Sequence, residues 1–363
     1  MKALYSLILS FFVSLVVCGV LIRLAREKGI YDEAEGVQKF HVGEVPRIGG
    51  LAIFASMMVV CLLYFASGKP FAGEYGRVVF AGIPVFVAGF LEDVTRNVSP
   101  RDRLAASFVS GILACALLPV ELRRVGISLL DPLFASGLFS FAFTAFAIAG
   151  VSQAFNIIDG FNGLCSGVAL ITFATYAVAA YLVNHSGGLF LSLSAFFAVL
   201  GFFVWNYPWG SIFLGDGGAY FLGYLVAVVG LLLVNKANLS PWFIMMVVIY
   251  PVWETVFSMF RKRFLRGMSP FVPDGLHFHM LIYKRIVKHV FCAEGNPVRK
   301  NSFTSPYLWI MHFAAALWAF FFRRNTGMLV LGVFIFIAFY VWLYLRLISF
   351  NTPNFLKKAW RTA

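Results

Sequence analysis

The chain has 363 residues, of which 61% are hydrophobic and only 12% are charged, and its mean hydropathy is +0.85. A soluble globular protein carries about 25% charged residues, so this composition excludes a soluble domain and indicates a multi-pass membrane protein. In such a protein Lys and Arg concentrate in the loops on the cytoplasmic side of the bilayer, and this explains the net charge of +13. We therefore expect no nucleic-acid partner.

Apolar runs recur along the whole chain. A transmembrane helix needs about 20 consecutive apolar residues, and the segment 121–137 could form a re-entrant or amphipathic piece between two such runs. We therefore predict an all-α polytopic membrane protein that forms a single domain over residues 1–363. The eleven predicted spans are 3–22, 48–66, 77–92, 103–120, 138–157, 163–183, 188–206, 215–234, 241–260, 305–322 and 327–349.

The basic residues predict the orientation in the membrane. Lys2 alone precedes the first apolar run, whereas Arg23, Arg26 and Lys28 follow it, so we expect a retained first helix with its N-terminus outside. Most other Lys and Arg residues then fall on the inner side, which predicts a cytoplasmic C-terminus. The long loop 261–304 carries nine basic residues against two acids. Attraction to anionic lipid head groups explains most of them, and a phosphate-binding surface is the sharper hypothesis.

The five predicted inner loops hold most of the unusual polar residues. Acids, amides, histidines and glycines gathered on one face are typical of a functional site rather than of scattered solvation. The five stretches are YDEAEGVQKFHVGEVPRIGG (31–50), LEDVTRNVSPRDRL (91–104), NIIDGFNGL (156–164), NYPWGSIFLGDGG (206–218) and PDGLHFH (273–279).

Glu92 and Asp93 end a predicted helix that runs toward the cytoplasm. Acids at a helix C-terminus oppose the helix dipole by about 0.3–1 kcal/mol each. A pair of solvated acids, bridged to Arg96 or Arg103, is one interpretation. The other interpretation is that the two acids take part in divalent-metal or phosphate-transfer chemistry at the membrane surface, because residues in locally unfavourable positions often serve function.

Three polar residues lie three apart in the stretch 156–164, namely Asn156, Asp159 and Asn162. If the stretch were helical, this spacing would place all three on one face. An acid in a turn or helix cap is the alternative interpretation for Asp159. The flanking amides favour a functional role, because an acid at the membrane edge is costly without partners.

Asp216 lies in a Gly-Asp-Gly-Gly stretch just before an apolar run, which fits an ordinary helix cap. The same glycines would also let a ligand approach the backbone, and a helix N-terminus favours phosphate. His277 and His279 are two residues apart, so they are poor partners on one helix face, but they could converge from a loop or turn. The carboxylates indicate Mg²⁺ or Mn²⁺, which take oxygen ligands, rather than zinc.

Taken in order, the five stretches resemble the polyprenyl-phosphate N-acetylhexosamine-1-phosphate transferases (glycosyltransferase family 4), and among them the bacterial undecaprenyl-phosphate N-acetylglucosamine-1-phosphate transferase branch. The resemblance runs from about Asp32 to about Lys284. It implies a multi-helix enzyme of the bacterial inner membrane with its site facing the cytoplasm. Such enzymes move a sugar-1-phosphate from a UDP-N-acetyl-sugar to undecaprenyl phosphate, release UMP and require Mg²⁺. Membrane lipids are further expected partners, and homodimerisation is left open.

The resemblance also implies roles for single residues. Asp216 matches the metal ligand of the family's Gly-Asp motif, and Asp159 with Asn156 matches its nucleotide-side Asn-x-x-Asp motif. Glu92 and Asp93 stand where the family usually has Asp-Asp, implicated in catalysis and in holding the lipid phosphate. His277 and His279 match histidines that meet the pyrophosphate or the sugar. The expected substrate-binding residues are Asn156, Asn162, Asp32, Lys39, His41, Arg103 and Asn206.

Three positions depart from the family pattern. Glu92 replaces an Asp, so Asp93 is expected to carry the main role of the pair, and Asn162 stands where the family often has a second Asp. Met280 follows the His-Phe-His run, whereas the branch that uses UDP-MurNAc-pentapeptide has three consecutive histidines. This last departure favours N-acetylglucosamine or another simple UDP-N-acetyl-sugar.

Two mechanisms are compatible with the sequence. In one, Asp93 with Glu92 orients the lipid phosphate, which attacks the β-phosphorus directly; in the other, a phospho-carboxylate forms first. An ion-coupled transporter is a different class of function, but transporters usually bind at the midplane between repeated halves. A catalytically inactive scaffold would be expected to lose its acids, and four of the five stretches keep theirs, while the fifth keeps His41 beside Asp32.

Overall fold

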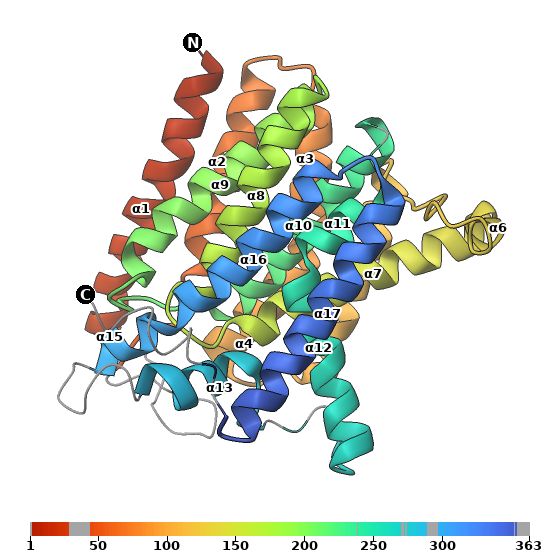
Figure 1. Cartoon of the computed structure of the whole chain (residues 1–363). Helices are drawn as coiled ribbons and strands as arrows, with labels where there is room; N and C mark the ends of the chain where they lie inside the picture. Colours follow the sequence, from red (N-terminus) through yellow and green to blue (C-terminus); the bar gives the residue numbers. More distant parts are fainter. Residues whose placement is uncertain are drawn as a thin grey trace.

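A computed structural model describes residues 2–28, 44–237, 239–269, 272, 274–288, 297–351 and 353. Apart from one isolated bridge at Val45, the secondary structure of these residues is entirely helical (Figure 1). This confirms the predicted all-α fold. The helices are α1 (Lys2–Lys28), α2 (Gly50–Ala66), α3 (Ala72–Ala81), α4 (Ile83–Thr95), α5 (Pro100–Leu117), α6 (Asp131–Ala135), α7 (Gly137–Ile158), α8 (Leu164–Leu182), α9 (Ser186–Asn206), α10 (Gly215–Ala237), α11 (Pro241–Val247), α12 (Ile249–Phe260), the π-helix η1 (Arg261–Leu265), α13 (Phe278–Ile282), the π-helix η2 (Tyr283–Val287), α15 (Pro297–Ser302), α16 (Thr304–Phe321) and α17 (Thr326–Ile348).

Fewer helices qualify as membrane spans than the eleven predicted. Within the described residues six helices are long and apolar enough to cross a bilayer: α1, α7, α8, α9, α10 and α17. The count reaches eight if the bent pairs α3–α4 (42°) and α11–α12 with η1 (74°) each form one span. Of the other predicted spans, α2 has only 17 residues, α5 starts with Arg101, Asp102 and Arg103, and α16 carries His312. The protein is a multi-pass membrane protein, and its orientation stays a prediction.

Helix α10 forms the centre of the bundle. All of its candidate spanning window is buried inside the protein, and it packs against α2, α4, α7 and α8. A helix that is apolar on every face is expected in such a position, because it has no side suited to water. The N-terminus of α10 carries the Gly-Asp-Gly-Gly stretch, so this motif lies at the middle of the helix bundle.

Small residues bring three helix ends close together at the start of α10. A Cβ atom added to Gly89 of α4 would lie 2.5 Å from the backbone nitrogen of Gly217, and one added to Gly50 of α2 would lie 2.3 Å from that of Gly218. Only glycine fits at such contacts, which are common where membrane helices pack closely. The close approach lets side chains of α4 reach the backbone of α10.

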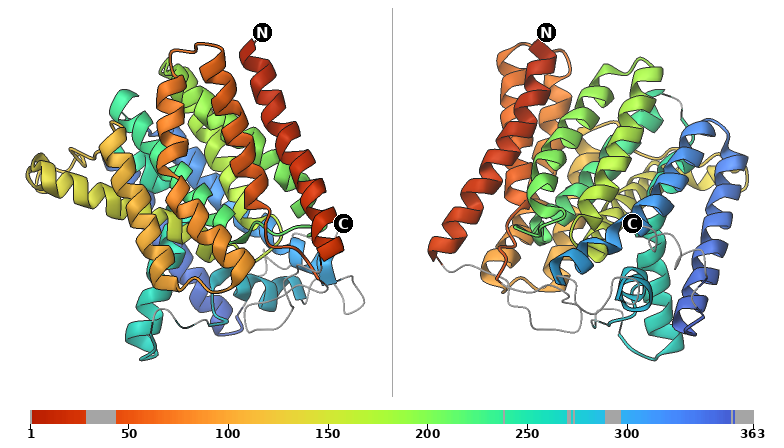
Figure 2. Two further views of the ribbon diagram at one scale, coloured as in Figure 1. Left: turned by 180° about the vertical axis from the view of Figure 1, so that it is seen from behind. Right: turned by 60° about the vertical axis from the view of Figure 1, so that its left-hand side comes forward.

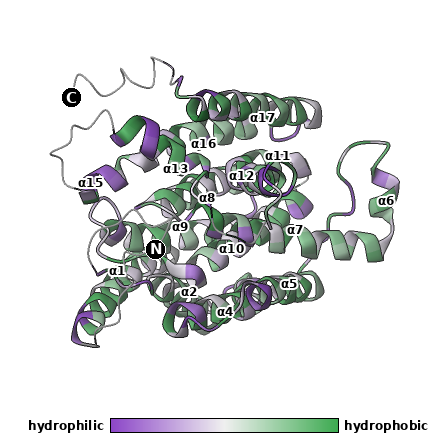
Figure 3. Cartoon of the chain, turned by 90° about the horizontal axis from the view of Figure 1, so that it is seen from below, coloured by the Kyte–Doolittle hydropathy of each residue, from purple (hydrophilic) through white to green (hydrophobic). Residues whose placement is uncertain are grey.

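The polar motifs gather at one end of the bundle, the lower end in Figures 1 and 2. Seen from below, this end shows hydrophilic segments at α15 and beside α13, while most of the helices are largely hydrophobic (Figure 3). The chain before α2 runs along the chain before α10, because Phe213 N–H donates to the carbonyl oxygen of Pro46 at 2.8 Å and Gly50 N–H to that of Leu214 at 2.8 Å. The described parts of all five motif loops therefore share one end of the molecule.

Candidate functional site

The carboxylate of Asp93 caps the N-terminus of α10. Its Oδ1 accepts a hydrogen bond from the backbone N–H of Asp216 at 2.8 Å, and its Oδ2 accepts one from that of Gly217 at 2.9 Å. The Asp93 side chain is only 1% exposed. A carboxylate is favourable here, because the first N–H groups of a helix have no partner within the helix and its dipole is positive at this end. Asp93 thus fixes the first turn of α10.

The Asp216 side chain lies between two arginines and an amide. Its Oδ2 accepts from Arg103 of α5, while its Oδ1 accepts from Arg47 and from Asn156 of α7, each at 3.0 Å. The same Arg47 nitrogen is 3.7 Å from Oδ1 of Asp93. Two carboxylates and two guanidinium groups therefore balance each other's charge in one cluster, which we call the acid–arginine cluster (Arg47, Asp93, Arg103, Asn156 and Asp216).

Four of the five residues of the acid–arginine cluster were predicted site residues, and the structure brings them together from four separate segments. Arg47 was missed, although it lies in the first motif between Pro46 and Ile48. A basic residue beside two glycines in a motif already singled out was the available signal. The residues predicted from that motif were Asp32, Lys39 and His41.

Glu92 lies beside Asp93 in the sequence but makes a different contact. Its Oε2 accepts the backbone N–H of Val98 at 2.8 Å and so holds the turn that follows α4. The left-handed conformation of Arg96 (φ 56°) ends the helix within this turn. Adjacent in sequence, the two acids point to different partners.

Asp159 borders the acid–arginine cluster with a free carboxylate. Helix α7 ends at Ile158, and no described residue hydrogen-bonds to the Asp159 side chain. Burial raises the pKa of the Asp159 carboxyl to about 7; Arg47 lowers this pKa and Asp216 raises it. Asp159 also contacts the cluster directly, because its backbone N–H donates to the carbonyl oxygen of Asn156 at 3.2 Å. It is a carboxyl whose charge would respond to a cation or a phosphate placed beside it.

Asn162 and Asn206 lie elsewhere. Because α7 ends at Ile158, Asn162 does not continue the helical face of Asn156, so the single polar face considered for this stretch is not formed. Asn162 is only 4% exposed; its Nδ2 donates to Ser302 Oγ at 3.1 Å. Asn206 accepts from Gly163 N–H at 2.7 Å and donates to the Ile212 carbonyl oxygen at 2.8 Å. Both amides brace the turn between α7 and α8.

The histidines of the last motif lie at the start of α13, with His277 just before the helix and His279 in its first turn. The rings of His277 and His279 lie parallel, with centroids 5.4 Å apart. His277 Nδ1 is 2.9 Å from Oε1 of Glu254, whereas neither ring nitrogen of His279 has a partner among the described residues. Burial lowers the pKa of His279 to about 3, so this ring is neutral at physiological pH.

His279 connects this loop with the turn that carries Asp159. A Cβ atom added to Gly160 would lie 3.0 Å from Nε2 of His279, and the ring of Phe161 packs edge-on against it. The last motif thus reaches the border of the acid–arginine cluster. The predicted residues Asp32, Lys39 and His41 lie outside the described residues.

The oxygen donors at this end of the bundle suit Mg²⁺. No group of three or more acidic, His or Cys side chains in the described part of the chain is arranged to hold a metal ion by itself. In phosphate-transfer sites, however, Mg²⁺ is usually bound by one or two carboxylates together with substrate phosphates and water. Asp216, with the nearby free carboxylate of Asp159, fits that pattern.

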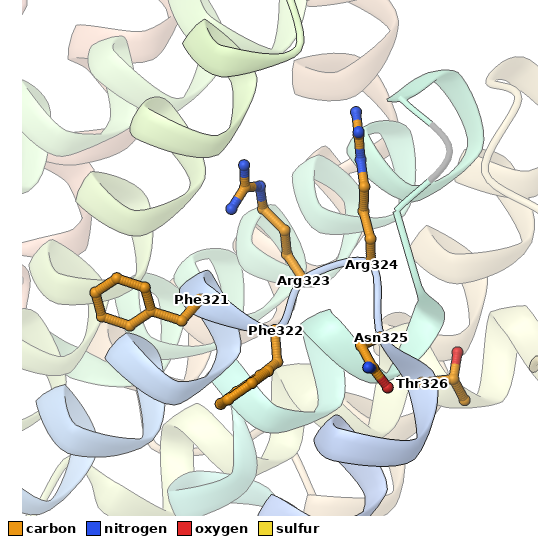
Figure 4. A pocket seen from close by; sticks show the side chains of 6 residues that line it. All are labelled: Phe321, Phe322, Arg323, Arg324, Asn325 and Thr326. Atoms are coloured by element: carbon orange, nitrogen blue, oxygen red, sulfur yellow. The ribbon is translucent and has the colours of Figure 1, made fainter.

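A separate pocket lies at the opposite end of the bundle, in the turn between α16 and α17 (Figure 4). It has a volume of about 550 Å³ and is lined by residues 321–326, including Arg323 and Arg324. None of the predicted site residues borders it. The pocket is therefore distinct from the acid–arginine cluster.

Comparisons with known proteins agree with this arrangement. The model of the family described as glycosyl transferase family 4 matches residues 75–234. A probable undecaprenyl-phosphate N-acetylglucosaminyl 1-phosphate transferase of Bacillus subtilis (strain 168) is 29% identical over 280 residues, covering 76% of this chain and 75% of that protein. An undecaprenyl-phosphate alpha-N-acetylglucosaminyl 1-phosphate transferase of Yersinia pestis is 28% identical over 292 residues (77% and 76%).

A second kind of relative is similar over a comparable length. A phospho-N-acetylmuramoyl-pentapeptide-transferase of Streptococcus pneumoniae (strain CGSP14) is 26% identical over 285 residues, covering 75% of this chain and 85% of that protein. The family match covers α4, α7 and the start of α10, which supply Asp93, Asn156 and Asp216. The chain belongs to glycosyl transferase family 4 and is a membrane enzyme of the sugar-1-phosphate transferase class.

Proposed function

We propose that this enzyme transfers N-acetylglucosamine-1-phosphate from UDP-N-acetylglucosamine to undecaprenyl phosphate, giving undecaprenyl-diphospho-N-acetylglucosamine and UMP. The product would start a lipid-linked cell-surface glycan. The names of the relatives from Bacillus subtilis and Yersinia pestis support this donor and acceptor. The His-Phe-His-Met run at residues 277–280, in place of three consecutive histidines, favours N-acetylglucosamine over the MurNAc-pentapeptide donor.

The observation that carries the proposal is the position of Asp216 between Arg47 and Arg103 at the N-terminus of α10. The reaction brings a pyrophosphate and a lipid phosphate together, so positive charge must be concentrated where they meet. Two guanidinium groups and a helix N-terminus provide it, since both bind phosphate oxygens well. Arg47 and Arg103 would exchange their bonds to Asp216 for bonds to phosphate.

Enzymes of this family use Mg²⁺, and Asp216 is the residue we assign to it. When bound, the ion supplies positive charge at the pyrophosphate. Asp159 and Asn156 would face the nucleotide side of the donor, and the neutral His279 would hydrogen-bond to the sugar or pyrophosphate. Asp93 would act mainly by holding the end of α4 against α10, so that the lipid phosphate meets a fixed first turn, and Glu92 by holding the turn that follows α4.

In the direct mechanism, an oxygen of the lipid phosphate forms a bond to the β-phosphorus of the donor. The bond from that phosphorus to the bridging oxygen breaks, and UMP leaves with the bridging oxygen and its electron pair. No carboxylate of the enzyme becomes phosphorylated. Incubation with UDP-sugar labelled in the β-phosphate, without lipid acceptor, should leave the protein unlabelled; a trapped phospho-enzyme would contradict direct attack.

The bacterial inner membrane is the location we propose, with the acid–arginine cluster facing the cytoplasm, where UDP-sugars are made. The donor is tested by incubating the purified enzyme with undecaprenyl phosphate, Mg²⁺ and a panel of UDP-N-acetyl-sugars, including UDP-MurNAc-pentapeptide. We expect the lipid product to form fastest with UDP-N-acetylglucosamine. Preferential turnover of the pentapeptide donor would contradict the substrate assignment but not the reaction type.

A further inference from the structure

Glu254 is a buried acid in α12 whose carboxylate is fully engaged. It is 1% exposed, and its Oε2 accepts the hydroxyl of Tyr340 from α17 at 2.7 Å. Oε1 lies 2.9 Å from Nδ1 of His277, and both oxygens face the backbone N–H of Phe278, at 3.2 and 3.3 Å. One carboxylate thus holds the side chain of one motif residue and the backbone of the next.

A second carboxylate approaches His277 from the other side. Asp274 Oδ1 is 3.7 Å from Nε2 of His277, and Asp274 itself accepts two hydrogen bonds from Arg261, at 2.9 and 2.8 Å. Arg261 also donates to the carbonyl oxygen of Leu276 at 2.7 Å. Both ring nitrogens of His277 therefore face acids of the protein, and Arg261 holds Asp274 and Leu276 in place before it.

His279 differs from His277 in each of these respects. It is 1% exposed, neither ring nitrogen has a hydrogen-bond partner within the described residues, and Nε2 faces Gly160 beside Asp159. A buried polar group without a partner costs free energy comparable to a lost hydrogen bond. Its nitrogens are therefore suited to a ligand that enters beside Asp159, and its ring rests flat against that of His277.

We propose that Glu254 is a positioning residue for the transferase reaction, acting through His277 and the Phe278 backbone to hold His279 in place beside Asp159. His277 then serves as a support, and His279 is the residue of this motif that meets the substrate. The inference rests on the proposed function and assigns different roles to the two histidines.

Stability alone does not account for this arrangement. Replacing a buried ionic network by apolar residues is often neutral or stabilising, so such a network is weak evidence for a stabilising role. Acids inside membrane proteins are costly and usually serve function. Apart from the hydrogen bond from Tyr340, the bonds of Glu254 go to His277 and Phe278, in the short segment that presents His279.

The test compares Glu254→Gln with a matched control. Glutamine keeps the size but turns an amide N–H toward one of the donors that Glu254 accepts. The control is Glu74→Gln, because Glu74 forms an ion pair with Lys236 at the opposite end of α10. In E254Q we expect kcat for UMP release to fall by at least about tenfold, with KM for UDP-N-acetylglucosamine changed less than about threefold. E74Q should keep wild-type kcat, and thermal melting confirms that each variant is folded at the assay temperature.

A double-mutant cycle with His279→Ala separates positioning from a general loss of structure. If Glu254 acts through His279, E254Q should lower kcat of the H279A enzyme by less than about twofold, so that the two effects are far from additive. Additive effects, or wild-type kcat in E254Q, would overturn the proposal. If E254Q does not fold, Tyr340→Phe, which removes a single donor to Glu254, takes its place with the same criteria. Absence of UMP with the wild-type enzyme would instead refute the proposed function itself.

Discussion

The carboxylate of Asp93 in α4 accepts the backbone N–H of Asp216 in α10, with 2.8 Å between Oδ1 and the nitrogen. An acid expected to act on the substrate therefore sets the position of the acid expected to hold the metal. The contact depends on Gly89, which lets α4 approach the backbone of α10. Helix packing and the geometry of the site are thus coupled at one point.

This coupling predicts the effect of Asp93→Asn. The amide can accept one of the two N–H groups but turns its own N–H₂ toward the other, which should cost about 1–2 kcal/mol of stability. Because the first turn of α10 would shift with Asp216, kcat should fall as well. Asp131→Asn is the control, since Asp131 accepts the N–H groups of Val125 and Gly126 in the loop before α6. Thermal melting should show the larger loss in D93N, because each oxygen of Asp93 accepts one N–H group, whereas the amide in Asp131→Asn can keep Oδ1 facing both of its donors. UMP release should fall only in D93N.

Asp216→Asn should abolish turnover while leaving the fold intact. The substitution keeps the shape of the side chain but removes the charge that balances Arg47 and Arg103 and that we assign to Mg²⁺. A loss of at least about a hundredfold in kcat is expected for a group that acts on the developing charge. Glu121→Gln, which removes the carboxylate that pairs with the exposed Arg123, should leave kcat unchanged. Near-normal activity in D216N would exclude Asp216 from the metal site.

The contacts of Asn162 explain why an amide rather than a carboxylate occupies this position. Its Nδ2 donates to Ser302 Oγ, which in turn donates to the carbonyl oxygen of Pro208. Asn162→Asp would replace this donor by a carboxylate at a site that is 4% exposed, and should lower stability by about 1–3 kcal/mol. We expect a lower thermal midpoint with KM for the UDP-sugar within about threefold of wild type. A large rise in KM without a loss of stability would instead support a role of Asn162 in binding the nucleotide.

Asp159 should make the stability of the free enzyme depend on pH. Burial raises the pKa of its carboxyl from 3.8 to about 7 in the folded protein, so the folded state holds this proton at higher pH than the unfolded state does. Its contribution to stability is then present at low pH and is lost as the pH rises from about 4 to about 7. Asp159→Asn cannot ionise and should show a flatter thermal midpoint between about pH 5 and about pH 8. Parallel curves for the two proteins would contradict the raised pKa.

Removal of divalent cations should stop the reaction reversibly. The described residues contain no complete metal cage, so Mg²⁺ is expected to bind mainly together with the donor and to exchange readily. EDTA should therefore abolish UMP release, and added Mg²⁺ should restore it without refolding. Activity that survives EDTA would contradict the assignment of Asp216 to a metal.

The sequence predicted the composition of the site better than its internal geometry. Asp93, Arg103, Asn156 and Asp216 could be picked out because charged and amide residues at the ends of apolar runs are rare and costly. Their mutual contacts depend on helix packing that no local pattern reports, such as the approach of Gly89 to Gly217. For the same reason the bracing role of Asn162 was not predictable, since its partners Asn301 and Ser302 follow it by 139 and 140 residues.

The contacts of Glu254 were not predictable for the same reason. Glu254 lies inside a predicted span, where a single acid among apolar residues gives a signal, but its partners His277 and Tyr340 lie 23 and 86 residues away. Eleven spans were predicted on apolar character, whereas six to eight helices of the described residues are long and apolar enough to cross a bilayer. Helix α2 has only 17 residues, α5 carries three charged residues in its first turn, and α16 holds Thr304, Ser305, Pro306 and His312 among its apolar residues. The positions of the helices were predicted well from the apolar runs.

The nucleotide released in the reaction distinguishes transfer of a sugar-1-phosphate from transfer of the sugar alone. Purified enzyme should be incubated with UDP-N-acetylglucosamine, undecaprenyl phosphate and Mg²⁺, and the nucleotide and the lipid analysed together. Transfer of a sugar-1-phosphate predicts one UMP for each undecaprenyl-diphospho-N-acetylglucosamine formed, and none without the lipid. Release of UDP would show transfer of the sugar alone, and absence of any nucleotide product with every UDP-N-acetyl-sugar would contradict the account.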